Sequence, residues 1–131
     1  MLKSELDLLW TSEIAEYKFD IMRNEIVFKL RTMNNGLFGT HVLVLKGVST
    51  CFFVNNNTDY RKEMYEITEE DYLEFTSINI LNNIKILPTS KEKEEWIEQF
   101  SGEANISIEI WSKLLLIEVE KVEINGKEYL L

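Results

Sequence analysis

The spacing of apolar side chains changes along the chain, and each spacing predicts a different element. Leu2, Leu6 and Leu9 recur at helical intervals and predict a short N-terminal helix over residues 2–10, with Ser4 as its expected cap. Further on, apolar and charged residues alternate in "YKFDI" and again in "IVFKLR", on the two sides of the polar break "MRN". Alternation with a period of two is typical of strands with one solvated face, so these runs predict a β-hairpin.

Strand patterns cover most of the remaining sequence. "NNG" at 34–36 predicts a turn, and "HVLVLKGVSTCFFV" predicts two strands around Gly47. Both strands are apolar on both faces, so we expect them at the centre of the sheet. After a polar connection at 55–63, "MYEI", "YLEFTSINI" and "IKIL" are typical of strands, with a turn at 82–83. "NISIEIW" alternates again, and "LLLIEVEKVEI" predicts one continuous strand with a bulge at 121–122.

A second helix is predicted over residues 90–101, in "SKEKEEWIEQFS". Trp96, Ile97 and Phe100 recur at helical spacing and form its expected buried stripe. Thr89 or Ser90 supplies a cap, and Gly102 supplies the stop.

The C-terminal "VEINGKEY" carries the strongest turn signal in the chain. Asn-Gly is preferred at the two central positions of a type I′ turn, where both residues have positive φ. A two-residue turn here pairs Val122 with Tyr129. It also sets Glu123 opposite Glu128, a like-charge pair that we expect to face solvent.

Together these elements predict a mainly β fold with a minor helical part. The 131 residues, 45% hydrophobic and 11% aromatic, are enough for one domain over residues 1–131 with its own core. The expected architecture is an antiparallel β-sandwich or a partly open β-barrel of about eight to ten strands. It carries the short N-terminal helix and one helix near 90–101.

The net charge of -9 is confined to one part of the chain. Residues 1–58 carry six acids and six bases, whereas residues 59–131 carry seventeen acids and eight bases. Phosphates would be repelled by such a surface, so neither nucleic acid nor an anionic membrane is expected as a partner. A basic protein partner fits the charge, and so does a purely solubilising role.

The compartment that the sequence favours is the cytoplasm. Glu5 and Asp7 interrupt any apolar signal-peptide region, and the longest apolar runs are too short to span a membrane. The single cysteine, Cys51, cannot form a disulfide within the chain.

No catalytic, metal-binding or cofactor-binding site is expected from the residues. His41 is the only histidine and Cys51 lies in an apolar run, so we expect structural roles for both. The twelve residues 59–70 resemble a calcium loop in length, but Arg61 occupies a ligand position and Met64 replaces the turn glycine. The three tryptophans are expected to be structural.

The most acidic stretch is "EITEEDYLEF", residues 66–75. If "EEDYLEF" is a strand, Leu73 and Phe75 face the core and the acids face solvent. A charged strip of this kind is a candidate docking surface for a basic protein, with tyrosines as anchors. The hypothetical partner-binding residues are Glu66, Glu69, Glu70, Asp71, Glu74, Tyr65 and Tyr72.

The segments "WTSEIAEYKFD", "ANISIEIW" and "VEINGKEY" give the chain a resemblance to a known family. Their order, with "GVS..FFVN" between them and "ING" near the end, resembles the YxiG-like proteins of Bacillus-type bacteria over most of the chain. These elements are aromatic and structural, and no catalytic residues are carried over from them. Such proteins are similar in setting to those encoded beside large secreted polymorphic toxins, which implies by analogy an immunity role.

We therefore expect a non-enzymatic binding protein that neutralises a toxin domain through an acidic surface. One alternative is a small-ligand-binding β-barrel whose aromatic side chains line a cavity. Another is a scaffold whose exposed strand edges pair with copies of itself. An enzyme is the last alternative, and the sequence leaves the oligomeric state open.

Overall fold

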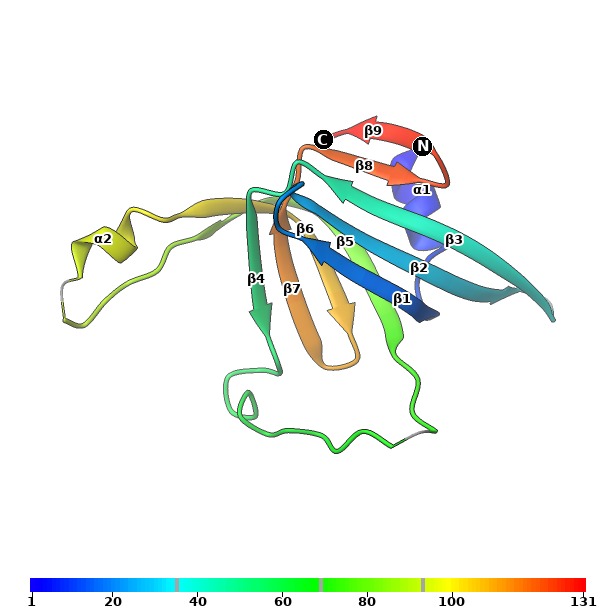
Figure 1. Cartoon of the computed structure of the whole chain (residues 1–131), viewed down its shortest axis with the longest axis horizontal. Helices are drawn as coiled ribbons and strands as arrows, with labels where there is room; N and C mark the ends of the chain where they lie inside the picture. The colour runs from blue at the N-terminus through cyan, green and yellow to red at the C-terminus, as the bar shows by residue number, and fades with distance from the viewer. Residues whose placement is uncertain (35, 69, 93) are drawn as a thin grey trace.

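The structure is a computed structural model that describes residues 1–34, 36–68, 70–92 and 94–131. These residues form one nine-stranded antiparallel sheet and two short helices, in strand order β4-β7-β6-β5-β1-β2-β3-β8-β9 (Figure 1). The elements are α1 (Leu2–Asp7), β1 (Ser12–Asp20), β2 (Glu25–Asn34), β3 (Leu37–Lys46), β4 (Thr50–Val54), β5 (Glu74–Ile86), α2 (Glu95–Glu98), β6 (Gly102–Ile110), β7 (Lys113–Glu118), β8 (Lys121–Ile124) and β9 (Lys127–Leu130).

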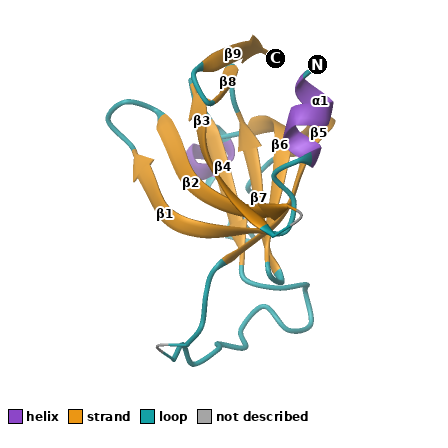
Figure 2. Ribbon diagram, turned by 90° about the vertical axis from the view of Figure 1, so that its right-hand side faces the viewer, coloured by secondary structure: helices purple, strands orange, loops and turns teal. Residues whose placement is uncertain are grey.

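The mainly β prediction is confirmed, and the sheet is open, not a closed barrel. Strands β4 and β9 lie at its two ends and do not pair with each other. β1 and β5 pair only at Ser12–Phe75 and Glu13–Glu74, so the sheet bends sharply there. The two parts curl around one interior (Figure 2), where the ring of Phe28 meets that of Phe75 edge-on at 5.4 Å. The helices among the described residues are too short and polar to cross a membrane.

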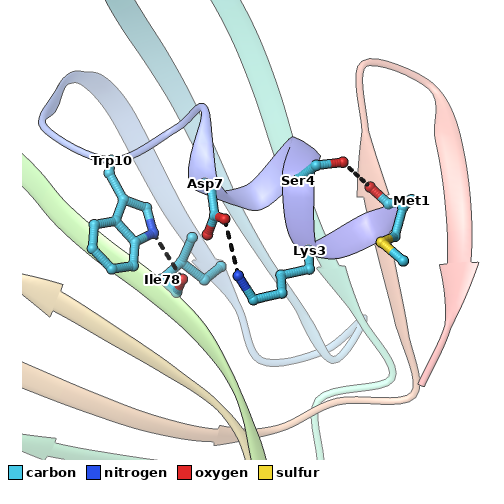
Figure 3. Close-up of polar contacts among 6 residues, drawn as sticks. All are labelled: Met1, Lys3, Ser4, Asp7, Trp10 and Ile78. Atoms are coloured by element: carbon cyan, nitrogen blue, oxygen red, sulfur yellow. Dashed lines mark hydrogen bonds and ion pairs between the residues drawn. The ribbon is translucent and has the colours of Figure 1, made fainter.

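Helix α1 covers one open side of the curled sheet. Leu6 in the helix and Leu9 just after it are each 1% exposed, so the predicted apolar stripe is buried. Trp10 follows, and its indole Nε1–H donates to the carbonyl of Ile78 in β5 at 2.9 Å (Figure 3). The expected cap is wrong, because the hydroxyl of Ser4 donates to a carbonyl instead of accepting a backbone N–H.

The two hairpins with the clearest local signals are confirmed. β1 and β2 pair on the two sides of "MRN", as their alternation predicts. Asn125 and Gly126 have φ of 51° and 88°, and Glu123 lies opposite Glu128. The ammonium of Lys46 in β3 bridges both carboxylates, at 3.6 and 2.8 Å. Its hydrogen bond with Glu128 raises the pKa of Lys46 and lowers that of Glu128, so a third strand compensates the like-charge pair.

Three strand predictions are wrong in their placement. β4 lies at an edge of the sheet, not at its centre. The expected turn at 82–83 is an irregularity inside the continuous strand β5, where Asn83 has a φ of 46°. The expected single strand "LLLIEVEKVEI" is split, because the amide of Glu120 donates to the carbonyl of Lys46 and turns the chain toward β3.

The predicted helix over 90–101 is reduced to the single turn α2. It lies in the connection from residue 87 to residue 101, which we call the arm and which projects away from the sheet (Figure 1). Trp96 is 63% exposed and Phe100 is 71% exposed, so the expected buried stripe has no surface to cover. The prediction that Trp96 is a core residue is therefore wrong. Trp10 and Trp111 are 41% and 50% exposed, but each makes a tertiary contact, which fits the structural role expected for them.

Candidate partner-binding surface

The acidic stretch lies in a long connection between β4 and β5, residues 55–73, which we call the acidic loop. It extends from one end of the sheet, at the bottom of Figures 1 and 2. The expected strand "MYEI" is wrong, and residues 70–73 are not part of a strand either, because β5 begins only at Glu74. The loop contains six carboxylates and two basic side chains.

Asn55 fixes the start of the acidic loop. Its side-chain N–H groups donate to the carbonyls of Arg61 at 3.0 Å and Glu63 at 2.7 Å. Its side-chain oxygen accepts a hydrogen bond from the ammonium of Lys113 in β7. A single amide side chain therefore ties the first half of the loop to the sheet.

Asp71 organises the second half of the loop. One of its carboxylate oxygens accepts the backbone N–H of Thr68 at 2.7 Å and the hydroxyl of Thr68 at 3.1 Å. The other accepts the hydroxyl of Tyr65 at 3.4 Å. The backbone N–H of Thr68 is the main cause that lowers the pKa of Asp71, because it stabilises the charged form. Asp71 thus holds a turn, in addition to contributing charge.

Apolar side chains are uncovered beside the carboxylates. Tyr65 is 74% exposed and Ile67 is 83% exposed, and both flank the exposed carboxylate of Glu66. Glu70 is also exposed. Large apolar side chains on a projecting segment mark a candidate interaction surface.

Tyr72 contacts an aromatic ring that the sequence did not associate with this site. Its ring centroid lies 5.8 Å from that of Trp111, in the turn between β6 and β7. The backbone N–H of Trp111 donates to the hydroxyl of Thr76 in β5 at 2.9 Å, which fixes the turn against the sheet. The only local signal for Trp111 was a tryptophan directly after an alternating strand.

The structure brings together only some of the predicted site residues. Tyr65, Glu66, Glu70, Asp71 and Tyr72 all lie on the acidic loop. Glu74 belongs to β5, where it is half-buried and its carboxylate accepts the hydroxyl of Thr76 at 3.2 Å. Glu69 lies outside the described residues. Leu73 and Phe75 pack toward the core as predicted.

Neither His41 nor Cys51, the two residues considered for nucleophilic or acid–base chemistry, belongs to the acidic loop. The ring nitrogens of His41 contact the hydroxyl of Thr32 at 3.2 Å and the side-chain amide of Asn125 at 2.9 Å. Cys51 is half-buried, and burial raises the pKa of its thiol. A neutral thiol is a poor nucleophile.

A shallow hollow lies beside Cys51. It has a volume of about 180 Å³ and is lined by residues that include Phe19, Ile21, Val48 and Cys51. Sites for drug-sized ligands usually occupy about 300–1,000 Å³. Among the described residues, no group of three or more His, Cys, Asp or Glu side chains is placed to hold a metal ion.

These features define a class of protein: a curled, open antiparallel sheet that presents an acidic and partly apolar loop. The sequence model of the YxiG-like proteins matches residues 2–129, so the chain belongs to the YxiG-like family. A search of curated proteins finds no match.

Proposed function

We propose that this chain is a protein-binding module that docks a basic protein partner onto the acidic loop, and that it serves as an immunity protein against a toxin domain. The observation that supports the proposal is the pairing of exposed apolar side chains with carboxylates on one projecting segment. Tyr65 and Ile67 would supply contact area, whereas Glu66 and Glu70 would supply attraction to positive charge.

The internal hydrogen bonds of the loop favour binding. Asn55 and Asp71 each hold part of the loop through two or more hydrogen bonds. A loop that is already ordered loses less conformational entropy when a partner docks. The bound shape is therefore expected to resemble the free one.

The charge of the loop bears on the nature of the partner. Six carboxylates against two cations attract a basic surface and accelerate encounter at low salt. A toxin domain that acts on nucleic acid needs a basic surface for phosphate. An acidic loop seated on that surface would exclude the substrate, which is the inhibitory role that we infer.

The test measures binding to the toxic domain of a secreted protein encoded beside this chain, across a salt series. We expect Glu66→Lys with Glu70→Lys to lower the association rate about tenfold at low salt, because two attractive charges become repulsive. The matched control is Glu92→Lys with Glu95→Lys, which makes the same charge change on the arm, at two exposed positions. Equal loss in both variants, or no loss in either, contradicts the acidic loop as the docking surface.

A second variant separates contact from charge. Ile67→Ala removes an exposed apolar side chain without changing the net charge. We expect faster dissociation with an unchanged association rate, since short-range contacts act mainly on the dissociation rate. Ile84→Ala, on β5 outside the loop, is the control and is expected to leave both rates unchanged.

A further inference from the structure

The free strand edges of the sheet differ in how they are protected. β9, "KEYL", carries Lys127 and Glu128. The half of β1 that does not pair with β5 carries Glu16, Lys18 and Asp20. β4, "TCFFV", carries no charged residue. Because unpaired backbone groups on an edge can pair with another chain, natural proteins usually place charges, prolines or bulges there.

β4 also exposes apolar surface on both of its faces. In the described structure it pairs with β7 alone, in unbroken register from Thr50–Glu118 to Val54–Leu114. Phe52 is 43% exposed and Phe53 is 58% exposed, and successive side chains of a strand point to opposite faces. In Figure 1, β4 lies at the outer end of the sheet, beyond β7. One more strand on this edge would cover both rings and pair the backbone.

We propose that the strand that covers β4 is β4 of a second copy of this chain, paired antiparallel about a two-fold axis. An antiparallel pair of identical strands is self-complementary, as a two-fold interface requires. A register centred on Phe52 uses all five residues and sets Thr50 opposite Val54 of the other copy. It sets each Cys51 opposite a Phe53, so aromatic and small side chains meet on one face.

The charges at the two ends of β4 favour this orientation. Lys113 lies at the Val54 end, and Glu118 lies beside Thr50 at the other end. Glu118 accepts a hydrogen bond from the hydroxyl of Thr50 at 3.0 Å. Antiparallel pairing puts the lysine end of one copy beside the glutamate end of the other, whereas parallel pairing would bring like charges together. The two β7 strands would be about 14 Å apart, so these charges do not bond directly and favour the antiparallel orientation mainly at low ionic strength, where screening is weak.

The proposed interface is small because it is centred on five residues of each copy. We therefore expect weak association, with a dimer that is populated only as the protein concentration rises. Light scattering should show a mass that rises from 15.5 kDa toward twice that value. Phe52→Lys places a charge at the centre of the edge and should weaken association about tenfold, while its half-exposed position leaves the fold intact. Leu130→Lys, an exposed position on β9, is the matched control and should dimerise normally. A dimer lost in Leu130→Lys but kept in Phe52→Lys overturns the proposal.

Disulfide trapping tests the register without relying on a stable dimer. In a Cys51→Ala background, Phe52→Cys places one thiol opposite its symmetry mate and should give a cross-linked dimer on oxidation. Phe53→Cys in the same background lies opposite position 51 of the other copy and should cross-link much less. A chain that stays at the monomer mass at every concentration and gives no Phe52→Cys cross-link overturns self-pairing. Preferential cross-linking through Phe53→Cys overturns the register.

Discussion

Helix α1 and the arm have similar helical patterns of apolar residues, but these residues are buried at α1 and exposed on the arm. Leu6 and Leu9 are each 1% exposed, whereas Trp96 and Phe100 are 63% and 71% exposed. α1 leads directly into β1 and lies against β5, but α2 sits in a connection that projects from the sheet (Figure 1). A helical pattern specifies an apolar stripe, and burial also requires a surface within reach of that stripe.

The region around α1 and the arm also differ in the hydrogen bonds that hold them in place. Around α1, the indole of Trp10 donates to the carbonyl of Ile78, and the hydroxyl of Tyr129 in β9 donates to the carboxylate of Glu5. α2 has no side-chain cap, and the carboxylate of Glu98 accepts the backbone N–H of Ser90 in the same connection at 3.2 Å. A helix of one turn without tertiary contacts is marginal in water.

The contrast is tested most strongly at Leu6. Leu6→Ala should lower the free energy of unfolding by about 2–4 kcal/mol, because it leaves a cavity under α1. Leu8→Ala, two residues on and largely exposed, should change it by less than about 0.5 kcal/mol. Urea denaturation measures both variants. Equal effects at the two positions would mean that α1 does not depend on its buried stripe.

The hydrogen bond of Trp10 should have a smaller effect. Trp10→Phe keeps an aromatic ring but removes the N–H that donates to Ile78, and we expect a loss of about 1 kcal/mol. Trp111→Phe removes an N–H from a half-exposed ring in the turn after β6 and should be close to neutral. If both substitutions give the same unfolding free energy, the contact between Trp10 and β5 does not anchor α1.

Local chemistry made parts of this fold predictable. The Asn125-Gly126 turn needs only positive φ at two adjacent residues, and β1 and β2 need only alternation around a short break. By contrast, the edge position of β4 depends on which distant strand pairs with it, and its apolar sequence does not encode that choice. The sequence predicts a turn at Asn83, whereas the structure has an irregularity within β5 there, because the positive φ that asparagine tolerates suits turns and bulges alike.

The candidate surface was predictable in its composition but not in its geometry. The excess of acids around Glu66 and Glu70 is visible in the sequence, and both side chains are exposed. The alternation around Asp71 and Tyr72 predicts a strand, but residues 70–73 are not part of one, because β5 begins only at Glu74. The contact of Tyr72 with Trp111 joins two segments that only the β5–β6–β7 pairing brings together, so sequence reasoning missed it.

The carboxylate of Asp71 holds a turn of the acidic loop by accepting the backbone N–H of Thr68, whereas α2 has no side-chain cap. This hydrogen bond makes a local pH response testable. The pKa of Asp71 is lowered mainly by the N–H of Thr68, so its contribution is present above the ordinary pKa of an aspartate. That contribution should be lost as pH falls through the lowered value in the folded chain. The amide proton shift of Thr68, followed by NMR, should titrate in this acidic range and should not do so in Asp71→Asn. An unchanged titration in the variant would assign it to another carboxylate.

The smallest effect is expected on the arm. Trp96→Ala and Phe100→Ala each remove a large ring, a change that costs about 3–5 kcal/mol in a core. Both rings are mostly exposed in this chain, so each variant should unfold within about 0.5 kcal/mol of the wild type. Urea denaturation of both variants and of Leu6→Ala under the same conditions compares the loss of a large ring on the arm with the loss of a smaller buried side chain under α1. A loss of more than about 1 kcal/mol at Trp96 would mean that the arm packs against the sheet in solution, and the contrast with α1 would then fail.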